Sequence, residues 1–251
     1  MQEIGLYNTT SSIFSKSYWR EAANQLKDVK MITIAALIVA LRIVVKYFRI
    51  PIAAGISITF DSYVNSLGSV VYGPVVAILV GAVSDTLGVL LTGKIGEYFL
   101  PFILTEILSS VIFALFFWRK KISFSSSLRA KFTINFICNI IMTSVFEKWR
   151  LFVFYGLDRA EAYNIINGVR IVKNLVMFPL EATLIVMILS AALPILSRLK
   201  LISRETCSIE KPSNKKMILQ MAFFMALSIC LVLLYIFVLK DFVSSLKLNF
   251  L

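Results

Sequence analysis

Long apolar segments, separated by short polar ones, follow one another along almost the whole chain. Hydrophobic residues make up 59% and charged residues 16% of the 251 residues, against roughly 45–50% and about 25% in soluble domains. An apolar helix of roughly 20 residues spans the hydrocarbon core of a bilayer. This pattern excludes a soluble enzyme, a disordered chain and a secreted disulfide scaffold. We predict an all-α, polytopic membrane helix bundle.

The apolar segments predict six core transmembrane helices and a seventh, C-terminal span. The Gly73-Pro74 dipeptide is a turn signal and divides residues 63–91 into two helices. The first of these is shorter than a span requires, so it must be tilted, extended upstream or shielded by protein. Residues 51–62 alternate loosely and are expected to be extended or looped. The predicted helices cover residues 31–48, 63–72, 75–91, 98–118, 132–155, 169–196 and 217–239.

These helices divide the chain into four parts. They are a cytoplasmic N-terminal extension at 1–30, a six-helix core at 31–196, a basic cytoplasmic linker at 197–216, and an additional apolar span with a C-terminal tail at 217–251. The N-terminal extension is expected to be a surface helix or a simple extension. Within the core, the Ser-rich residues 122–130 are expected to form a loop.

Basic residues gather in the polar segments between the apolar ones. The net charge of +12 would favour a nucleic-acid partner in a soluble domain, but clusters placed between apolar runs are typical of cytoplasmic membrane loops. We therefore expect no nucleic-acid partner, a cell membrane as the location, and a cytoplasmic N-terminus. The clusters on that side are Lys16, Arg20, Lys27 and Lys30; Arg119, Lys120, Lys121, Arg129 and Lys131; and six basic residues between 198 and 216.

Several catalytic chemistries are excluded by residues that the sequence lacks. No histidine is present, so neither a Ser-His-Asp triad nor a histidine-based metal site is possible. The cysteines Cys138, Cys207 and Cys230 form no CxxC pair, and no phosphate-binding GxxxxGK[ST] loop occurs. We expect a binding or transport protein that is not an enzyme and needs no metal or cofactor.

Polar residues interrupt three of the apolar segments. An ionisable residue inside a span is costly and suggests a functional site, and residues three or four apart share a helix face. These stripes predict a water-accessible pocket lined by an acid, amides and two cations. The alternative is structural pairing, with Glu106 neutralising Arg170 or Lys173 and the amides bonding across helices. The candidates are Glu106, Asn135, Asn139, Arg170, Lys173 and Asn174.

Two further carboxylates and one pair of small residues leave alternatives open. A structural hydrogen bond explains Asp85 and Glu181 as well as a ligand contact does. Together with Glu106, they also fit an autonomous ion-coupled carrier that uses carboxylates as relay groups. Ala36 and Ala40 are four apart, so another helix can approach them closely. Internal packing explains the same two alanines.

Four stretches in combination resemble a known family. They are Ala36-x-x-x-Ala40; SITFDSYVNSLGSVVYGPVVAILVGAVSDTLG at 57–88; FLPFILTEILSSVIFALFFWRKKI at 99–122; and RIVKNLVMFPLEA at 170–182. The succession resembles the substrate-binding S component of energy-coupling factor (ECF) vitamin transporters, closest to the folate family. The N-terminal extension and the seventh apolar run depart from this pattern.

The resemblance implies a six-helix protein that binds one vitamin from outside. Such proteins dock on a transmembrane coupling protein with two ATPase subunits, and the alanine motif is implied to face the coupling protein. Ligand contacts are implied in the external halves of helices four to six, which contain the candidate residues. Folate members carry a pattern at the fourth helix that stands here only as Phe99-Leu-Pro-Phe102, so another vitamin such as pantothenate stays an alternative.

Folate suits such a site chemically, because it is a dianion with a flat pterin ring. Arg170, Lys173 and Arg42 are candidate partners for its carboxylates. Glu106 or an asparagine is the candidate for paired hydrogen bonds to the pterin edge. Pantothenate, a smaller anion, is compatible with the same cations.

Overall fold

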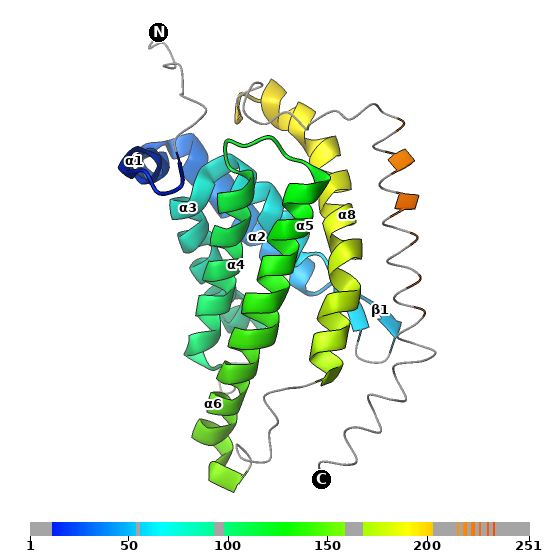
Figure 1. Ribbon diagram of the computed structural model, residues 1–251. Coiled ribbons are helices and arrows are strands. Elements are labelled where there is room, and N and C mark those ends of the chain that lie inside the picture. Colours follow the sequence, from blue (N-terminus) through cyan, green and yellow to red (C-terminus); the bar gives the residue numbers. More distant parts are fainter. Residues whose placement is uncertain are drawn as a thin grey trace.

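A computed structural model describes residues 12–53, 56–92, 98–158 and 168–202, together with isolated positions between 215 and 233. The chain is mostly helical, and the helices form one bundle (Figure 1). Apart from those isolated positions, the predicted seventh span at 217–239 lies outside the described residues. Among the described residues, three stretches are long and apolar enough to cross a membrane: Asp61–Leu91, Leu100–Phe117 and Met177–Arg198.

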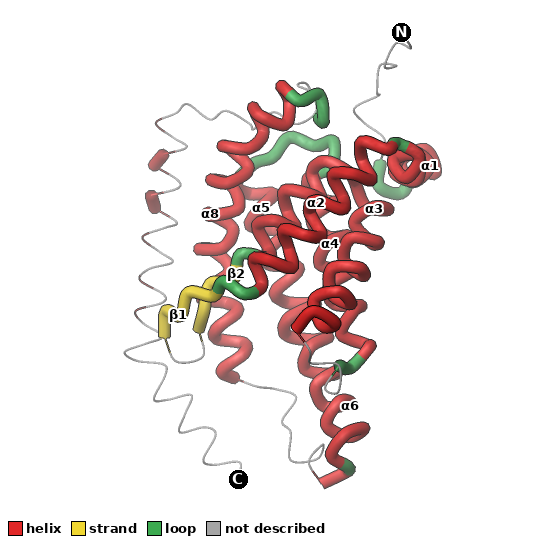
Figure 2. The backbone as a smooth tube through the Cα atoms, turned by 180° about the vertical axis from the view of Figure 1, so that it is seen from behind, coloured by secondary structure: helices red, strands yellow, loops and turns green. Residues whose placement is uncertain are grey.

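The described elements follow the predicted order, with one short strand pair added. The helices are α1 (Lys16–Asn24), η1 (Gln25–Lys27), α2 (Val29–Lys46), α3 (Asp61–Thr92), η3 (Leu100–Phe102), α4 (Ile103–Phe117), α5 (Phe124–Thr133), η4 (Ile134–Met142), α6 (Thr143–Tyr155) and α8 (Gly168–Arg198). Strands β1 (Arg49–Ala53) and β2 (Ile56–Thr59) pair antiparallel, with Ile50 opposite Ile58. This hairpin follows α2 (Figure 2) and is a small departure from an all-helical fold.

Helix α3 folds back on itself at Gly73, as the Gly73-Pro74 dipeptide predicts. Gly73 has φ +73° and ψ −177°, a conformation that glycine adopts readily. Asp61 bonds to Arg42, whereas Asp85 lies 3.8 Å from Lys46, one turn further along α2. A straight helix would place Asp61 and Asp85 about 36 Å apart. The two arms of α3 are therefore antiparallel.

The connection between α4 and α5 is shorter than the sequence predicts. Residues 122–130 were expected to form a loop, but α5 begins at Phe124. The hydroxyl of Ser123 accepts from the backbone N–H of Ser126, and the Ser126 hydroxyl accepts from that of Ser123. This reciprocal pair is a capping box that starts a helix. The serines therefore begin α5, and α5, η4 and α6 form one continuous helical run.

Close backbone approach holds the second arm of α3 against α4. A Cβ atom at Gly81 would lie 2.9 Å from the Cα atom of Ile107, and Ala77 and Ala114 are both completely buried. In a bilayer the lipid is as apolar as the core, so small residues that permit tight van der Waals packing drive helix association. This packing places the polar residues of α4 directly beside those of α3.

Basic segments from three parts of the chain meet at one end of the bundle, which we call the basic end (Figure 1). It is formed by α1, the α4–α5 connection and the C-terminal end of α8. The Lys30 ammonium donates to the carbonyl of Leu199 at 2.9 Å, and Arg119 forms an ion pair with Glu21. The described basic residues of α1, of the α4–α5 connection and of the end of α8 thus lie at the same end of the fold, whereas Lys131 is buried within the bundle.

Candidate functional site

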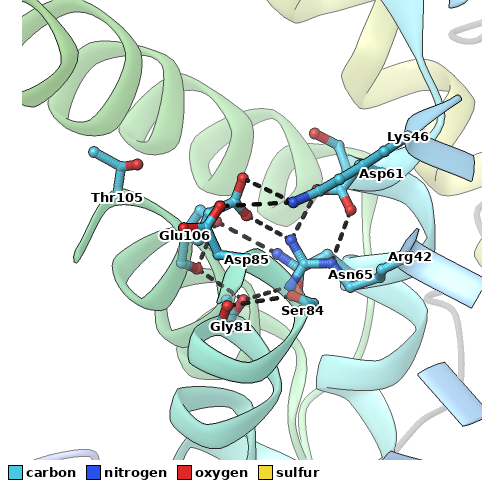
Figure 3. A network of polar contacts seen from close by, with 12 residues as sticks. Arg42, Lys46, Asp61, Asn65, Gly81, Ser84, Asp85, Thr105 and Glu106 are labelled. Atoms are coloured by element: carbon cyan, nitrogen blue, oxygen red, sulfur yellow. Dashed lines mark hydrogen bonds and ion pairs between the residues drawn. The ribbon is translucent and has the colours of Figure 1, made fainter. Parts of the chain in front are cut away.

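Five charged side chains from three helices meet in what we call the charged cluster (Figure 3). Its members are Arg42 and Lys46 of α2, Asp61 and Asp85 of α3, and Glu106 of α4. The cluster lies at the end of α2 that is distant from α1, because Lys46 is the last residue of α2. The fold-back of α3 is what brings two of its carboxylates to this place.

Arg42 is the centre of the charged cluster and is completely buried. Its Nε and Nη2 atoms donate to the two carboxylate oxygens of Asp61 at 2.9 and 2.8 Å. Nη2 also donates to Glu106 Oε2 at 2.6 Å, and Nη1 to the Ser110 hydroxyl at 3.3 Å. Bidentate pairing of this kind fixes the geometry of a guanidinium. Arg42 therefore ties α2 to both α3 and α4.

Lys46 adds a looser second layer to the charged cluster. Its ammonium lies 3.8 Å from Asp85 Oδ1 and 3.7 Å from Glu106 Oε1, and its side chain is partly exposed. The Tyr98 hydroxyl donates to the other oxygen of Asp85 at 3.1 Å. Asp85 thus makes a structural hydrogen bond, which is one of the two roles left open for it by the sequence.

Glu106 pairs with two cations of α2 in the described part of the chain, Arg42 and Lys46. The structural alternative named Arg170 and Lys173 of α8, and the side chain of Arg170 lies outside the described residues. Gly81 of α3 lies directly against the backbone of Glu106 and Ile107, so the first turn of α4 stands beside α3. Asp61 completes the cluster but was missing from the candidates, because it lies between the hairpin and the first apolar arm, outside every predicted span.

Three asparagines form a second, uncharged group, which we call the amide cluster. Asn139 Nδ2 donates to Asn135 Oδ1 and to Asn174 Oδ1, both at 3.1 Å. Asn135 Nδ2 donates to the backbone carbonyl of Asn174, also at 3.1 Å. The cluster thus joins η4 to α8. The predicted shared face of Asn135 and Asn139 is present in the structure, and it faces the predicted residue of α8.

The amide cluster sits on an unusual helix. The segment η4 is a π-helix of nine residues, in which the backbone N–H of Thr143 bonds to the carbonyl of Cys138. Its wider turn leaves room that an α-helix lacks, and π-helical segments are frequent at functional sites. Asn135 is buried, whereas Asn139 and Asn174 are partly exposed.

The other two cations of the candidate set stand on α8. Lys173 is partly exposed, and the side chain of Arg170 lies outside the described residues. Deeper along α8, Glu181 pairs with Lys131 of α5 at 3.2 Å, and Lys131 also donates to the Ser62 hydroxyl at 2.9 Å. Lys131 of α5 therefore joins α8 through an ion pair and α3 through a hydrogen bond.

Ala36 and Ala40 lie on an exposed face of α2. The large side chains beside them, Leu37 and Val44, are also exposed, whereas Ala35 is buried. Their exposure, in the part of the chain that the structure describes, is compatible with contact to a further helix.

With this geometry in view, the chain can be compared with known proteins. The model of one family, described as "ECF transporter, substrate-specific component", matches residues 30–191. The chain belongs to this family. It is accordingly a membrane protein, and the matched residues contain the charged cluster, the amide cluster and the exposed alanines.

Individual relatives match over most of their own length. Folate transporter FolT of Clostridium novyi (strain NT) is 29% identical over 160 residues, which cover 64% of this chain and 88% of that protein. Folate transporter FolT of Leuconostoc mesenteroides subsp. mesenteroides is 25% identical over 156 residues, covering 61% of this chain and 81% of that protein. A crystal structure of FolT bound with folic acid matches with a TM-score of 0.51 and 26% identity, covering 62% of this chain and 89% of that one.

Proposed function

We propose that this S component binds folate with high affinity and passes it across the membrane when docked on a coupling protein with two ATPases. One observation carries the proposal: two relatives are folate transporters, and a similar structure was solved with folic acid bound. The chain carries no phosphate-binding loop of its own, so the proposed transport depends on ATPases supplied by partners.

The proposed folate site is formed by Glu106, Asn135, Asn139, Arg170, Lys173 and Asn174. An amide offers donors and acceptors side by side, which suits the edge of a pterin ring. Asn139 and Asn174 are the partly exposed members of the amide cluster. A carboxylate has about four lone-pair positions, so Glu106 is able to accept from a pterin donor while it is paired with Arg42.

The two cations of α8 are proposed to meet the carboxylates of folate. Arg170 and Lys173 precede Asn174 on the same helix, so cations and amides stand next to one another. Arg42 is unsuited to this task, because its guanidinium is completely buried and already bonded to two carboxylates. In this assignment α8 binds the ligand, whereas the charged residues at the end of α2 hold the helices together.

The proposed topology has six crossings: α2, the two arms of α3, α4, the α5–η4–α6 run, and α8. The basic end faces the cytoplasm, because basic segments stay on that side. The N-terminus is then cytoplasmic and the folate site opens to the outside. The additional apolar run at 217–239 is proposed as a seventh span that places the C-terminus outside.

The exposed alanines are the proposed contact with the coupling protein. Small residues four apart let two helices approach closely, and Ala36 and Ala40 provide this on an exposed face of α2. The charged cluster lies near the end of the same helix, so it also holds the proposed docking surface in place.

The experiment that tests the proposal is a search for the bound vitamin. The chain is purified in detergent, any co-purified small molecule is identified by mass spectrometry, and folate, 5-formylfolate and pantothenate are titrated in a calorimeter. Tight one-to-one binding of a folate supports the proposal. Binding of pantothenate alone would identify pantothenate as the substrate instead of folate. No binding of any vitamin by folded protein would overturn the assignment.

A proton-driven carrier is the competing function, with Asp85, Glu106 and Glu181 as relay groups. Each of these carboxylates has a cationic partner in the structure, which disfavours free relay groups. Uptake by the chain alone in ATP-free vesicles under a proton gradient would revive this alternative.

A further inference from the structure

Helix α1 lies outside the residues matched by the family model, which begin at residue 30. It nevertheless packs tightly on the bundle. The rings of Tyr18 and Trp118 meet edge to face with centroids 5.1 Å apart, and Ala22 is completely buried. Arg119 stacks over the Trp118 ring at 4.5 Å and pairs with Glu21. Burial raises the pKa of Tyr18 to about 12, so its hydroxyl stays protonated.

Its direction distinguishes α1 from the other helices. Figures 1 and 2 show α1 nearly end-on, whereas the bundle helices run along the vertical direction. Because Trp118 ends α4 at the basic end, α1 is held across the bundle axis at the depth where the spans reach the membrane surface. A helix in this position lies in the plane of the bilayer.

The outer face of this segment combines large apolar side chains with cations. Phe14, directly before α1, is 97% exposed, and Trp19 is 39% exposed. After α1, Val29 is 79% exposed. The indole N–H of Trp19 donates to the carbonyl of Ile13 at 2.9 Å, so this ring needs no water partner. The exposed cations that alternate with these residues are Lys16, Arg20, Lys27 and Lys30.

Such a face matches the membrane surface in both its apolar and its charged parts. Interfacial helices bury aromatic and aliphatic side chains at the level of the headgroups and present lysine and arginine to anionic lipids. Each such cation strengthens the attraction to an anionic leaflet. In water, by contrast, the exposed side chains of Phe14 and Trp19 would bury no apolar surface and would not stabilise the helix.

We propose that α1 is an interfacial helix that binds anionic phospholipid headgroups through Lys16 and Arg20, with Phe14 and Trp19 inserted beside them. The helix is joined to α2 through η1, so this anchor fixes the membrane depth of the helix that carries the exposed alanines. The proposal requires that the bundle spans a membrane, and it is independent of which vitamin is bound.

Trp19 is a suitable reporter of this contact. The chain has three tryptophans, of which Trp118 is buried and Trp149 exposed on α6. In a Trp149→Phe background, subtracting the emission of the additional Trp19→Phe variant isolates the signal of Trp19. The full chain is reconstituted in nanodiscs of phosphatidylcholine with about 30% phosphatidylglycerol, an anionic surface of the kind that attracts basic helices.

Quenching by brominated lipids then locates Trp19. We expect lipids brominated near the headgroup to quench Trp19 more than lipids brominated near the terminal methyl. Moving the bromines from phosphatidylcholine to phosphatidylglycerol at equal mole fraction is expected to increase quenching about twofold or more, because the cations enrich the anionic lipid locally. Trp19 that is quenched by aqueous iodide and by neither lipid would overturn the proposal.

Charge variants test the cations separately from the aromatic residues. Lys16→Gln plus Arg20→Gln is expected to abolish the preference for phosphatidylglycerol, while shallow quenching persists through the aromatic side chains. The matched control, Lys121→Gln plus Arg129→Gln, removes the same charge from exposed positions at the same end and is expected to leave the preference in place. Equal quenching by the two lipids in the unmodified chain would overturn the headgroup assignment. Protection of Trp19 that appears only when the coupling protein is added would assign α1 to a protein surface.

Discussion

The charged cluster and the amide cluster both join helices through buried and partly buried polar side chains, but they do so by different chemistry. Arg42 is completely buried and makes four hydrogen bonds to fixed partners, three of them to carboxylates. The amide cluster is neutral and has three bonds of 3.1 Å, one within the π-helix and two that join it to α8. A buried ion pair is costly to break, whereas amides exchange partners cheaply. The comparison suggests that the first cluster holds the fold and the second is suited to meet a ligand.

The largest expected effect comes from removing the centre of the charged cluster. Arg42→Met leaves Asp61 and Glu106 partly buried without their cation, which is expected to cost about 3–5 kcal/mol of folding free energy. The measurement is thermal unfolding in detergent. Arg129→Met, at an exposed position, is the matched control and is expected to change little. An Arg42→Met protein as stable as the control would show that the cluster does not hold α2.

A smaller effect is expected in the amide cluster, and it concerns folate affinity instead of folding stability. Asn139→Ala removes the amide that bridges Asn135 and Asn174. The free energy of folate binding is expected to weaken by about 1–3 kcal/mol, which raises Kd roughly fivefold to 150-fold. Calorimetric titration measures this, and thermal unfolding of the same sample is expected to change by only about 1 kcal/mol. Asn24→Ala, an exposed asparagine of α1, is the matched control; equal affinities in the two variants would remove Asn139 from the site.

Glu106 sharpens the comparison, because it belongs to the charged cluster and is also proposed to bind folate. Glu106→Gln is expected to lower stability by about 1–2 kcal/mol, since Arg42 keeps Asp61 as a partner, and to weaken folate binding severalfold. Asp85→Asn is the comparison variant: its ion pair with Lys46 is long and partly exposed, so a loss of at most about 1 kcal/mol in stability is expected. Equal folate affinities in both variants would confine Glu106 to a structural role.

The smallest effect on either cluster is expected at the exposed alanines. Ala36→Trp plus Ala40→Trp adds bulk to an exposed face, so stability and folate affinity are expected to stay within about 0.5 kcal/mol of the unmodified chain. Co-purification with the coupling protein is expected to be lost. Leu91→Trp, at an exposed position of α3, is the control that keeps the partner. Normal recovery of the complex with both alanines replaced would contradict the docking assignment.

Local sequence signals predicted the parts of the fold that depend on local chemistry. The fold-back at Gly73 follows from a glycine-proline turn, and the shared face of Asn135 and Asn139 follows from their spacing. The Ser-rich segment was misread, because serine is common both in loops and at helix starts. The reciprocal bonds of Ser123 and Ser126 decide between these possibilities.

Contacts between distant segments were beyond the reach of these signals. Arg42 precedes the β1–β2 hairpin in the sequence and Asp61 follows it, so their bond depends on how the hairpin folds back. The pairing of Glu106 requires α4 to lie beside α2. Nothing in the spacing of single helices specifies which of several cations a carboxylate meets. The role of α1 was equally hidden, since its contact with Trp118 joins residues far apart in the chain.

The most direct test of the central claim is an experimental structure of the chain with folic acid bound. The account predicts that the pterin ring hydrogen-bonds to the side chains of Asn139 and Asn174, while Arg42 keeps its bidentate contact with Asp61. A ligand that instead breaks the contact between Arg42 and Asp61, or that lies away from the amide cluster, would contradict the division between a cluster that holds the fold and a cluster that binds the vitamin.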